Sequence, residues 1–110
     1  MIIREWRGRA SRSRSEAYPA HFREKVVPEL RELPGFAGAD LGQRRLDDML
    51  EFVVLTRWQS MEAVRGFAGA DIEKAVVEPD AVAALVDFDS SVRHYELVES
   101  VGASRYPEDV

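Results

Sequence analysis

The sequence has no cysteine among its 110 residues. Disulfides, thiolate nucleophiles, iron–sulfur clusters and cysteine zinc sites are therefore excluded. Long hydrophobic runs are also missing, because no window reaches the roughly 18 apolar residues that cross a bilayer. The N-terminus lacks the charged, apolar and small regions of a signal peptide. We therefore expect a cytoplasmic protein with no membrane partner.

The sequence has fewer basic than acidic residues, with 15 Lys and Arg against 20 Asp and Glu, which gives a net charge of −5. A surface of that sign repels a phosphate backbone, so no nucleic acid partner is expected. One basic run stands out near the N-terminus, and it is either solvated or placed to touch an anionic ligand. Its members are Arg4, Arg7, Arg9, Arg12 and Arg14.

Length and composition predict a single domain. A chain of this size, with 45% hydrophobic residues, can bury one core but not two. We expect the domain to occupy residues 1–99. Residues 100–110 are polar, have little to bury, and are expected to form a C-terminal tail.

The most informative stretch is residues 52–67, where a β-branched apolar run passes directly into an amphipathic helix. Ser60 can accept from the free amides of the first helical turn, and Glu62 lies where the helix dipole favours an anion. Met61, Val64 and Phe67 then fall near one face. The pattern predicts a strand from residue 49 to 58 and a helix that ends before Ala68.

The rest of the chain supplies further elements. We expect a strand over 2–10, a helix over about 15–33 that Pro28 bends or interrupts, and a hairpin that joins 36–45 to 49–58. Short helices are expected over 71–77, capped by Asp71, and over 81–86, capped by Asp80. The last strand is expected over about 90–99.

This order predicts an α+β fold, a ferredoxin-like split βαβ unit with an antiparallel sheet. Helices cover only one face of such a sheet, so the apolar side chains on the other face need a cover. A second subunit is the simplest one, and we expect a homodimer.

A resemblance to known proteins spans most of the chain and is carried by residues 1–9, 33–36, 52–69 and 94–96. In these segments the sequence resembles the antibiotic biosynthesis monooxygenase family of dimeric α/β barrels. The resemblance implies two sheets packed into a barrel, and in each subunit a pocket between the sheet and its helices. Relatives with this pattern include cofactor-independent quinone-forming oxygenases, haem-degrading enzymes and isomerase-like proteins.

Only two histidines are present, so an imidazole base must be His21 or His94. We favour His94, because the alternation of the last strand puts it on the same face as Glu96, which could orient the ring. A structural His94 is the alternative. His21 is expected at a pocket rim or in solvent.

Aromatic side chains exceed what packing of so small a domain requires, which fits an apolar ligand pocket. The alternative for each is a core position. Expected substrate-binding residues are Trp6, Arg4, Phe22, His21, Phe52, Phe67 and Phe88. Expected donors to a bound anion are Arg4, Arg44, Arg57 and Trp58, of which Arg57 and Trp58 join His94 as candidate catalytic residues.

Metal and haem chemistry find little support in the sequence. The two histidines lie on separate elements, with no carboxylate spaced to converge on a metal. In the haem-degrading relatives the axial histidine lies on the helix after the tryptophan strand, whereas residues 71–77 contain none. We therefore expect oxygenation of a small aromatic phenol, anthrone or dihydroquinone without a cofactor. A ligand-binding or structural dimer, and a non-redox isomerase or cyclase, remain alternatives.

Overall fold

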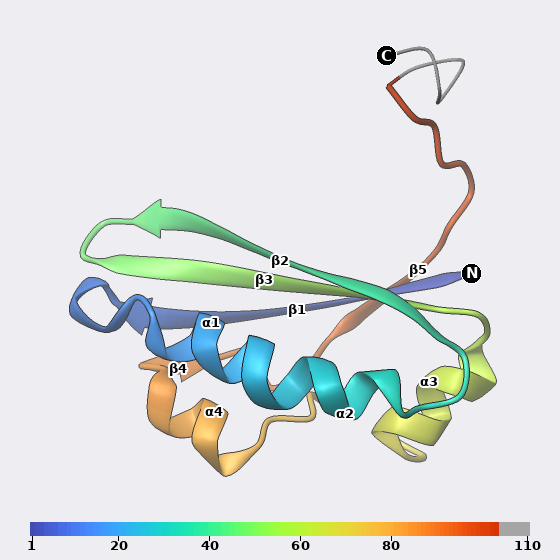
Figure 1. Cartoon of the computed structure of the whole chain (residues 1–110), viewed down its shortest axis with the longest axis horizontal. Helices are drawn as coiled ribbons and strands as arrows, with labels where there is room; N and C mark the ends of the chain where they lie inside the picture. Colours follow the sequence, from blue (N-terminus) through green and yellow to red (C-terminus); the bar gives the residue numbers. More distant parts are fainter. Residues whose placement is uncertain (104–110) are drawn as a thin grey trace.

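An antiparallel sheet forms one layer of the molecule (Figure 1). The computed structural model describes residues 1–103, and among these five strands pair in the order β2-β3-β1-β4, with β5 also pairing to β1. Their bounds are β1 Ile2–Ser11, β2 Phe36–Leu46, β3 Met49–Trp58, β4 Asp87–Phe88 and β5 Arg93–Glu96.

The central pair, β1 and β3, runs antiparallel over its whole length, from Ile2 opposite Trp58 to Ser11 opposite Met49. Strand β3 joins β2 in the predicted hairpin, whose turn places Asp47 at a positive φ of 54°. Aspartate tolerates this left-handed conformation better than most residues, and for that reason it is typical of a turn.

A helical segment follows β1 and crosses the sheet. It consists of α1 Ala17–His21, a π-helical turn η2 Phe22–Val26, and α2 Val27–Arg31. A short 3-10 turn, η1 Arg12–Arg14, precedes it. In the π turn the amide of Val27 donates to the carbonyl of Phe22, five residues back. The next residue, Pro28, has no amide to donate, so the predicted interruption of this helix is confirmed just before the proline.

Helix α3 Met61–Ala68 begins as predicted, with Oγ of Ser60 accepting from the amide of Ala63 at 3.1 Å. Met61, Val64 and Phe67 all pack toward the cluster built on Leu30, Trp58 and Val64. The apolar spacing therefore identified the buried face of the helix correctly.

After α3, the helix predicted over 71–77 is wrong, and two other predicted elements exist with different bounds. Residues 71–77 form a turn and an extended segment, with an isolated bridge between Lys74 and Ser91. Helix α4 spans Pro79–Ala84, so its N-cap is Glu78 and not Asp80. Strand β5, Arg93–Glu96, is shorter than the last strand predicted over about 90–99, and the short strand β4, Asp87–Phe88, was not predicted.

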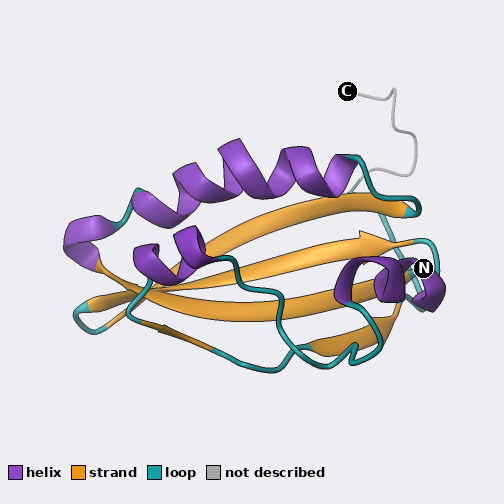
Figure 2. Cartoon of the chain, turned by 90° about the horizontal axis from the view of Figure 1, so that it is seen from below, coloured by secondary structure: helices purple, strands orange, loops and turns teal. Residues whose placement is uncertain are grey.

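All helices of the described chain lie on one face of the sheet (Figure 2). Inward positions on β3 are buried against them, namely Phe52, Val54, Thr56 and Trp58. The opposite face carries charge near the turn between β2 and β3, where Glu51 contacts Arg7, Arg9 and Arg44 at 3.4, 3.4 and 2.7 Å. The predicted α+β fold with an antiparallel sheet is confirmed, and its second face lacks a cover within residues 1–103.

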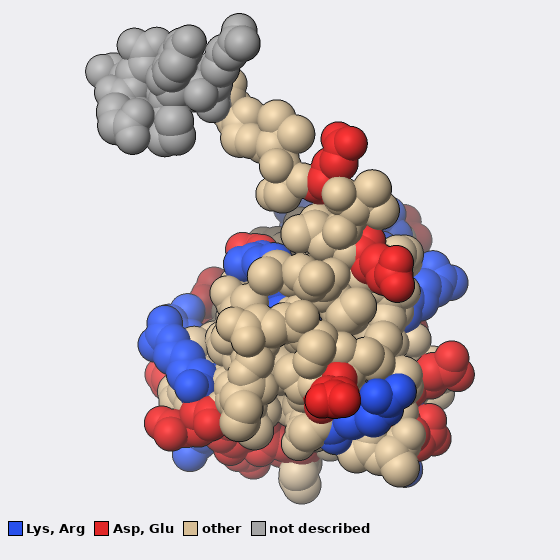
Figure 3. Space-filling view, turned by 90° about the vertical axis from the view of Figure 1, so that its right-hand side faces the viewer, with Lys and Arg blue, Asp and Glu red and all other residues tan. Residues whose placement is uncertain are grey.

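After β5 the chain runs away from the sheet (Figure 1). Residues 98–103 are exposed, and the remainder of the predicted tail lies outside the described residues. On the face shown in Figure 3, acidic and basic side chains are interspersed, with no broad patch of one sign. No helix within residues 1–103 is both long and apolar enough to span a membrane.

Candidate functional site

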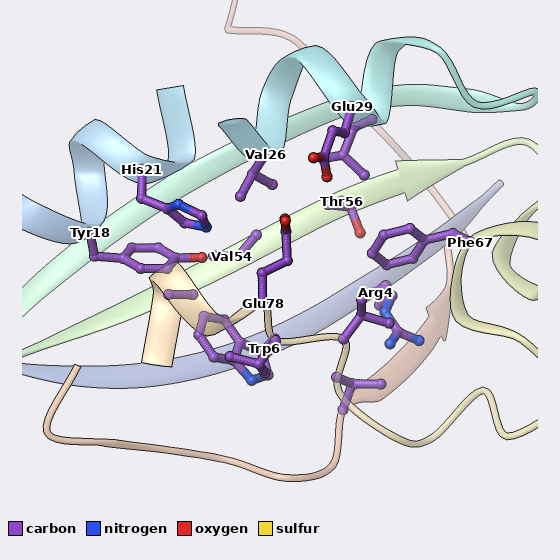
Figure 4. Close-up of a pocket in the computed structure, with 15 residues that line it drawn as sticks. Arg4, Trp6, Tyr18, His21, Val26, Glu29, Val54, Thr56, Phe67 and Glu78 are labelled. Carbon is purple, nitrogen blue, oxygen red and sulfur yellow. The ribbon is translucent and has the colours of Figure 1, made fainter. Parts of the chain in front are cut away.

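A cavity of about 320 Å³ lies between the sheet and the helices (Figure 4). This volume is near the lower end of the range of about 300–1,000 Å³ for ligand pockets. Most of its wall is apolar, with contributions from β1, β3, α1, α2, α3 and the segment before α4. The lining residues are Arg4, Trp6, Tyr18, His21, Val26, Glu29, Leu30, Val54, Thr56, Phe67, Val76, Val77, Glu78, Ala81 and Val92.

Four polar residues line the cavity besides Arg4 and Thr56: Tyr18 and His21 lie at one end, and the carboxylates of Glu29 and Glu78 point toward each other nearer its middle (Figure 4). Burial, followed by the charge of Glu78, raises the pKa of the Tyr18 phenol, which therefore stays protonated and can donate. Burial and the nearby Glu29 carboxylate raise the pKa of Glu78. Two carboxylates held close together disfavour double ionisation, so the Glu29 and Glu78 pair can hold a proton as well as release one.

His21 is 8% exposed, and its Nε2 has no hydrogen-bond partner among residues 1–103. A buried polar atom without a partner costs roughly 1–3 kcal/mol, so such atoms are rare and need an explanation. The ring lies beside Tyr18, at 6.0 Å between ring centroids, and faces the cavity (Figure 4). The arrangement leaves one imidazole nitrogen available to a molecule in the cavity.

Arg4 lines the other end of the cavity, and its guanidinium bonds to backbone carbonyl groups. Nη1 donates to the carbonyl of Ile72 at 2.6 Å, and Nη2 donates to the carbonyl of Lys74 at 2.9 Å. The guanidinium also lies 5.5 Å from the centre of the Phe67 ring. Burial lowers the pKa of Arg4 to about 10, which still leaves it charged at neutral pH. Arg4 therefore holds the turn at residues 72–74 against the sheet.

His94 is the second partner of Arg4, since its Nε2 lies 2.9 Å from Nη1. A guanidinium can only donate, so Nε2 must accept and the ring proton belongs on Nδ1. Burial and then the charge of Arg4 lower the pKa of His94, with Glu73 acting in the opposite direction. The imidazole is therefore neutral, and its basic nitrogen is occupied.

Thr56 brings a hydroxyl to the cavity wall. Its Oγ1 accepts from Nε1 of the fully buried Trp58 at 2.8 Å. Because that bond uses a lone pair of the hydroxyl, the Thr56 proton is directed to a different acceptor. Trp58 itself stacks on Phe67 at 5.3 Å and lies beneath the site.

The structure brings together only some of the predicted site residues. Arg4, Trp6, His21 and Phe67 line the cavity, whereas His94 does not. The expected pairing of His94 with Glu96 is replaced by the contact with Arg4.

The other predicted site residues lie away from the cavity wall. Phe52 and Trp58 are completely buried core residues, and Phe22 packs against the core cluster that contains Phe52 and Tyr18. Phe88 contacts Trp6 from behind, at 6.3 Å between ring centroids. Arg57 pairs with Asp40 and Arg44 with Glu51, both on the opposite face of the sheet, so neither can reach a molecule in this cavity.

Four polar lining residues were missed from the sequence: Tyr18, Glu29, Thr56 and Glu78. A signal existed for Thr56, the one polar residue in the inward series Phe52, Val54, Thr56 and Trp58. No comparable signal marks Tyr18, and no local sequence pattern links Glu78 to Glu29.

Within residues 1–103, no group of three or more histidine, aspartate or glutamate side chains is arranged to hold a metal ion. The carboxylates at the cavity are limited to Glu29 and Glu78.

Comparison with known proteins agrees with this architecture. A Bacillus cereus protein described as an antibiotic biosynthesis monooxygenase has a similar structure, with a TM-score of 0.65 at 19% identity over 96% of this chain and 98% of that one. SnoaB of Streptomyces nogalater, a cofactor-independent oxygenase, gives a TM-score of 0.60 at 16% identity, covering 91% and 96%. ActVA-Orf6 of Streptomyces coelicolor, a monooxygenase solved with nanaomycin D, gives 0.52 at 16% identity, covering 86% and 82%.

The TM-scores establish a shared fold, and at these low sequence identities they establish nothing further. No protein with a curated description matches the chain significantly. Residues 1–79, however, match the sequence profile of antibiotic biosynthesis monooxygenases. The chain belongs to the antibiotic biosynthesis monooxygenase family.

Proposed function

We propose that this protein is a cofactor-independent monooxygenase that oxidises an electron-rich aromatic compound with molecular oxygen. The observation that carries the proposal is the buried Nε2 of His21, which faces an apolar cavity without a partner among the described residues. Two structural relatives, SnoaB and ActVA-Orf6, are described as an oxygenase and a monooxygenase. The family match makes the same class of reaction the first to test here.

The cavity wall suits an aromatic substrate. Trp6 and Phe67 present rings to it, and Val54, Val76 and Val77 add aliphatic surface. Burying such a substrate removes water from the reacting atoms, which strengthens every electrostatic interaction inside the cavity. It also protects a radical intermediate from side reactions.

The base in this proposal is His21. Its Nε2 would take a proton from the acidic C–H or O–H of the substrate, leaving a resonance-stabilised anion. Tyr18 and Thr56 each offer a hydroxyl proton to the anion. His94 was the first choice from the sequence, but a base whose accepting nitrogen already receives a bond from Arg4 would have to break that bond first.

Electrons and atoms balance without a further reactant. The substrate anion passes one electron to oxygen, and the substrate radical and superoxide then join through a new C–O bond. The protonated His21 returns its proton to give a hydroperoxide. Cleavage of the O–O bond with loss of the remaining C–H proton releases water and leaves a carbonyl. An anthrone methylene group thereby becomes a quinone carbonyl and one water molecule.

The test is oxygen uptake and quinone formation by the metal-free protein with a panel of anthrones and dihydroquinones. In His21→Gln we expect kcat to fall by about 100-fold or more, the usual contribution of a general base. His94→Gln is the matched control, and we expect it to retain most of its activity.

The outcomes separate the candidate activities. Loss of activity in the His94 variant alone would contradict the assignment of the base. Conversion without oxygen consumption would indicate an isomerase or cyclase, and saturable binding without conversion would indicate a ligand-binding dimer.

A homodimer is part of the proposal. The second face of the sheet carries half-buried Ile3, Val53 and Leu55 beside the ion pairs of Glu51, and no described helix covers it. A second copy would bury this surface and close the two sheets into a barrel. Sedimentation velocity should therefore give a dimer for the wild type and a monomer for Leu55→Arg, and a monomeric wild type at micromolar concentration would remove the barrel.

A further inference from the structure

The carboxylates of Glu29 and Glu78 point toward each other although they come from different elements, α2 and the residue that caps α4 (Figure 4). Glu29 is exposed and Glu78 is half-buried, so the pair occupies the rim while His21 lies deeper. We call these two side chains the acidic rim.

No cation of the described chain neutralises the acidic rim. Neither carboxylate forms an ion pair within residues 1–103. Arg4 is the one arginine or lysine lining the described cavity, and its guanidinium is committed to Ile72, Lys74 and His94. The acidic rim therefore has no arginine or lysine partner in the described chain, and the one opposing influence on Glu78 is His21, which acts to lower its raised pKa.

The groups around the acidic rim favour the same kind of partner. The rings of Trp6 and Tyr18, 5.7 Å apart between centroids, line the cavity beside it. Aromatic faces attract cations, an attraction that grows when water is excluded. The unpartnered Nε2 of His21 can accept a hydrogen bond from an N–H group of a ligand.

We propose that the acidic rim binds a protonated amine, so that the ligand of this cavity is an aromatic compound carrying an ammonium group. The inference rests on the proposed function in that it places the substrate in the same cavity. An ammonium group held there would also lower the pKa of a nearby phenol or acidic C–H group of the same molecule, which assists its deprotonation.

Charge distinguishes this ligand class from the alternatives. A carboxylated aromatic would meet repulsion from Glu29 and Glu78, whereas a neutral one would gain only the apolar contacts. Exposed ion pairs are weak, so Glu29 alone contributes little, and the half-buried Glu78 carries more of the selectivity. We expect a tenfold preference for the amine, about 1.4 kcal/mol.

The test uses three matched probes, 2-naphthylmethylammonium, 2-naphthylmethanol and 2-naphthylacetate, with isothermal titration calorimetry near neutral pH. For the wild type we expect the amine to bind about tenfold more tightly than the alcohol, and the acetate to bind most weakly. In Glu29→Gln/Glu78→Gln the amine and alcohol should bind within about twofold of each other.

Two single variants at exposed positions separate a loss of amine binding from a loss of folding. Glu29→Gln changes an exposed side chain and should reduce the preference in part. Glu24→Gln, an exposed glutamate of the neighbouring π turn that does not line the cavity, should leave the preference unchanged. Circular dichroism confirms that each variant is folded.

Equal affinity for amine and alcohol in the wild type would overturn the inference, as would a preference that survives in the double variant or an absence of amine binding. The proposed oxygenase reaction can fail independently. Selective amine binding without oxygen uptake by any substrate would retain the acidic rim and remove the oxygenase. Turnover of neutral anthrones without a preference for the amine would retain the oxygenase and remove the acidic rim as an amine site.

Discussion

Replacing Arg4 by methionine tests whether one side chain holds the cavity wall in place. Methionine keeps much of the apolar stem but removes the bonds to the carbonyls of Ile72 and Lys74, at 2.6 and 2.9 Å, and the contact with His94. The segment that Arg4 fastens continues into Val76, Val77 and Glu78, which line the cavity. We therefore expect the change to loosen that wall while the sheet stays paired.

The magnitude follows from the bonds. A hydrogen bond from a charged donor contributes about 1.5–3 kcal/mol, and each carbonyl left without a partner costs about 1–3 kcal/mol. Removing the guanidinium also recovers the cost of burying it, which is the cause of the lowered Arg4 pKa. The net loss in the free energy of unfolding should be about 2–3 kcal/mol, or a fall in Tm of roughly 10 °C.

Three assays measure this change. Urea unfolding gives the global free energy, and hydrogen exchange at the amide of Ala75, which donates to the carbonyl of Ser90 at 2.9 Å, gives the local opening of the segment. NMR titration of His94 should show its pKa rising, because the Arg4 charge that helps to lower it is gone.

The opposite face of β1 supplies a matched control. Arg7→Met removes an arginine whose side chain is 39% exposed and whose ion pairs are long, at 3.4 Å, so stability should change by less than about 1 kcal/mol. Arg4→Lys retains the charge but not the fork that reaches both carbonyls, and should be intermediate. If Arg4→Met left the Ala75 exchange rate and the His94 pKa unchanged, the fastening role would be refuted.

Three further predictions concern the cavity. Glu78 has a raised pKa in the fold, so its stabilising contribution is present below the ordinary value of 4.5 and is lost as pH rises through the folded pKa; Glu78→Gln should therefore gain stability relative to wild type from pH 4 to pH 7 in urea unfolding. His21→Leu should raise the free energy of unfolding by about 1 kcal/mol, because it removes an unpartnered buried nitrogen. Thr56→Val keeps the volume but leaves Nε1 of Trp58 without its acceptor, and should lower Tm at a cost of about 1–3 kcal/mol.

Each of these predictions has a result that would contradict it. A pH-independent difference between Glu78→Gln and wild type would show that Glu78 is not penalised in the fold. A destabilised His21→Leu variant would show that the imidazole has a structural partner. A Thr56→Val variant as stable as wild type would mean that Trp58 finds another acceptor.

The parts of the fold predicted well are those whose signals are local and repeated. The run 49–58 alternates toward the core, and Ser60 caps the helix whose apolar spacing follows, so strand and helix were both placed correctly. Residues 71–77 lacked such a signal of their own. They are held instead by partners distant in the sequence: Arg4 donates to the carbonyls of Ile72 and Lys74, and the backbone of residues 73 and 75 bonds to that of residues 90 and 92.

The difference between local signals and distant contacts also explains which residues of the site could be predicted. Composition showed that aromatic side chains were abundant enough for a pocket, and Trp6 and Phe67 do line one. It could not show which face of the last strand is inward, or that Arg4 would occupy Nε2 of His94. Glu29 and Glu78 meet only through the packing of two helical segments, which no spacing in the sequence specifies.

The cavity concentrates features that a structure selected for stability alone would avoid. Glu78 holds a carboxyl whose pKa is raised, and His21 buries a nitrogen without a partner in the described chain. Such perturbed groups gather at functional sites, because stability is sacrificed there for binding or chemistry. The predicted gain in stability of His21→Leu and the predicted loss of oxygenase activity of His21→Gln therefore follow from the same unpartnered nitrogen. A variant that lost both stability and activity would instead identify His21 as part of the framework.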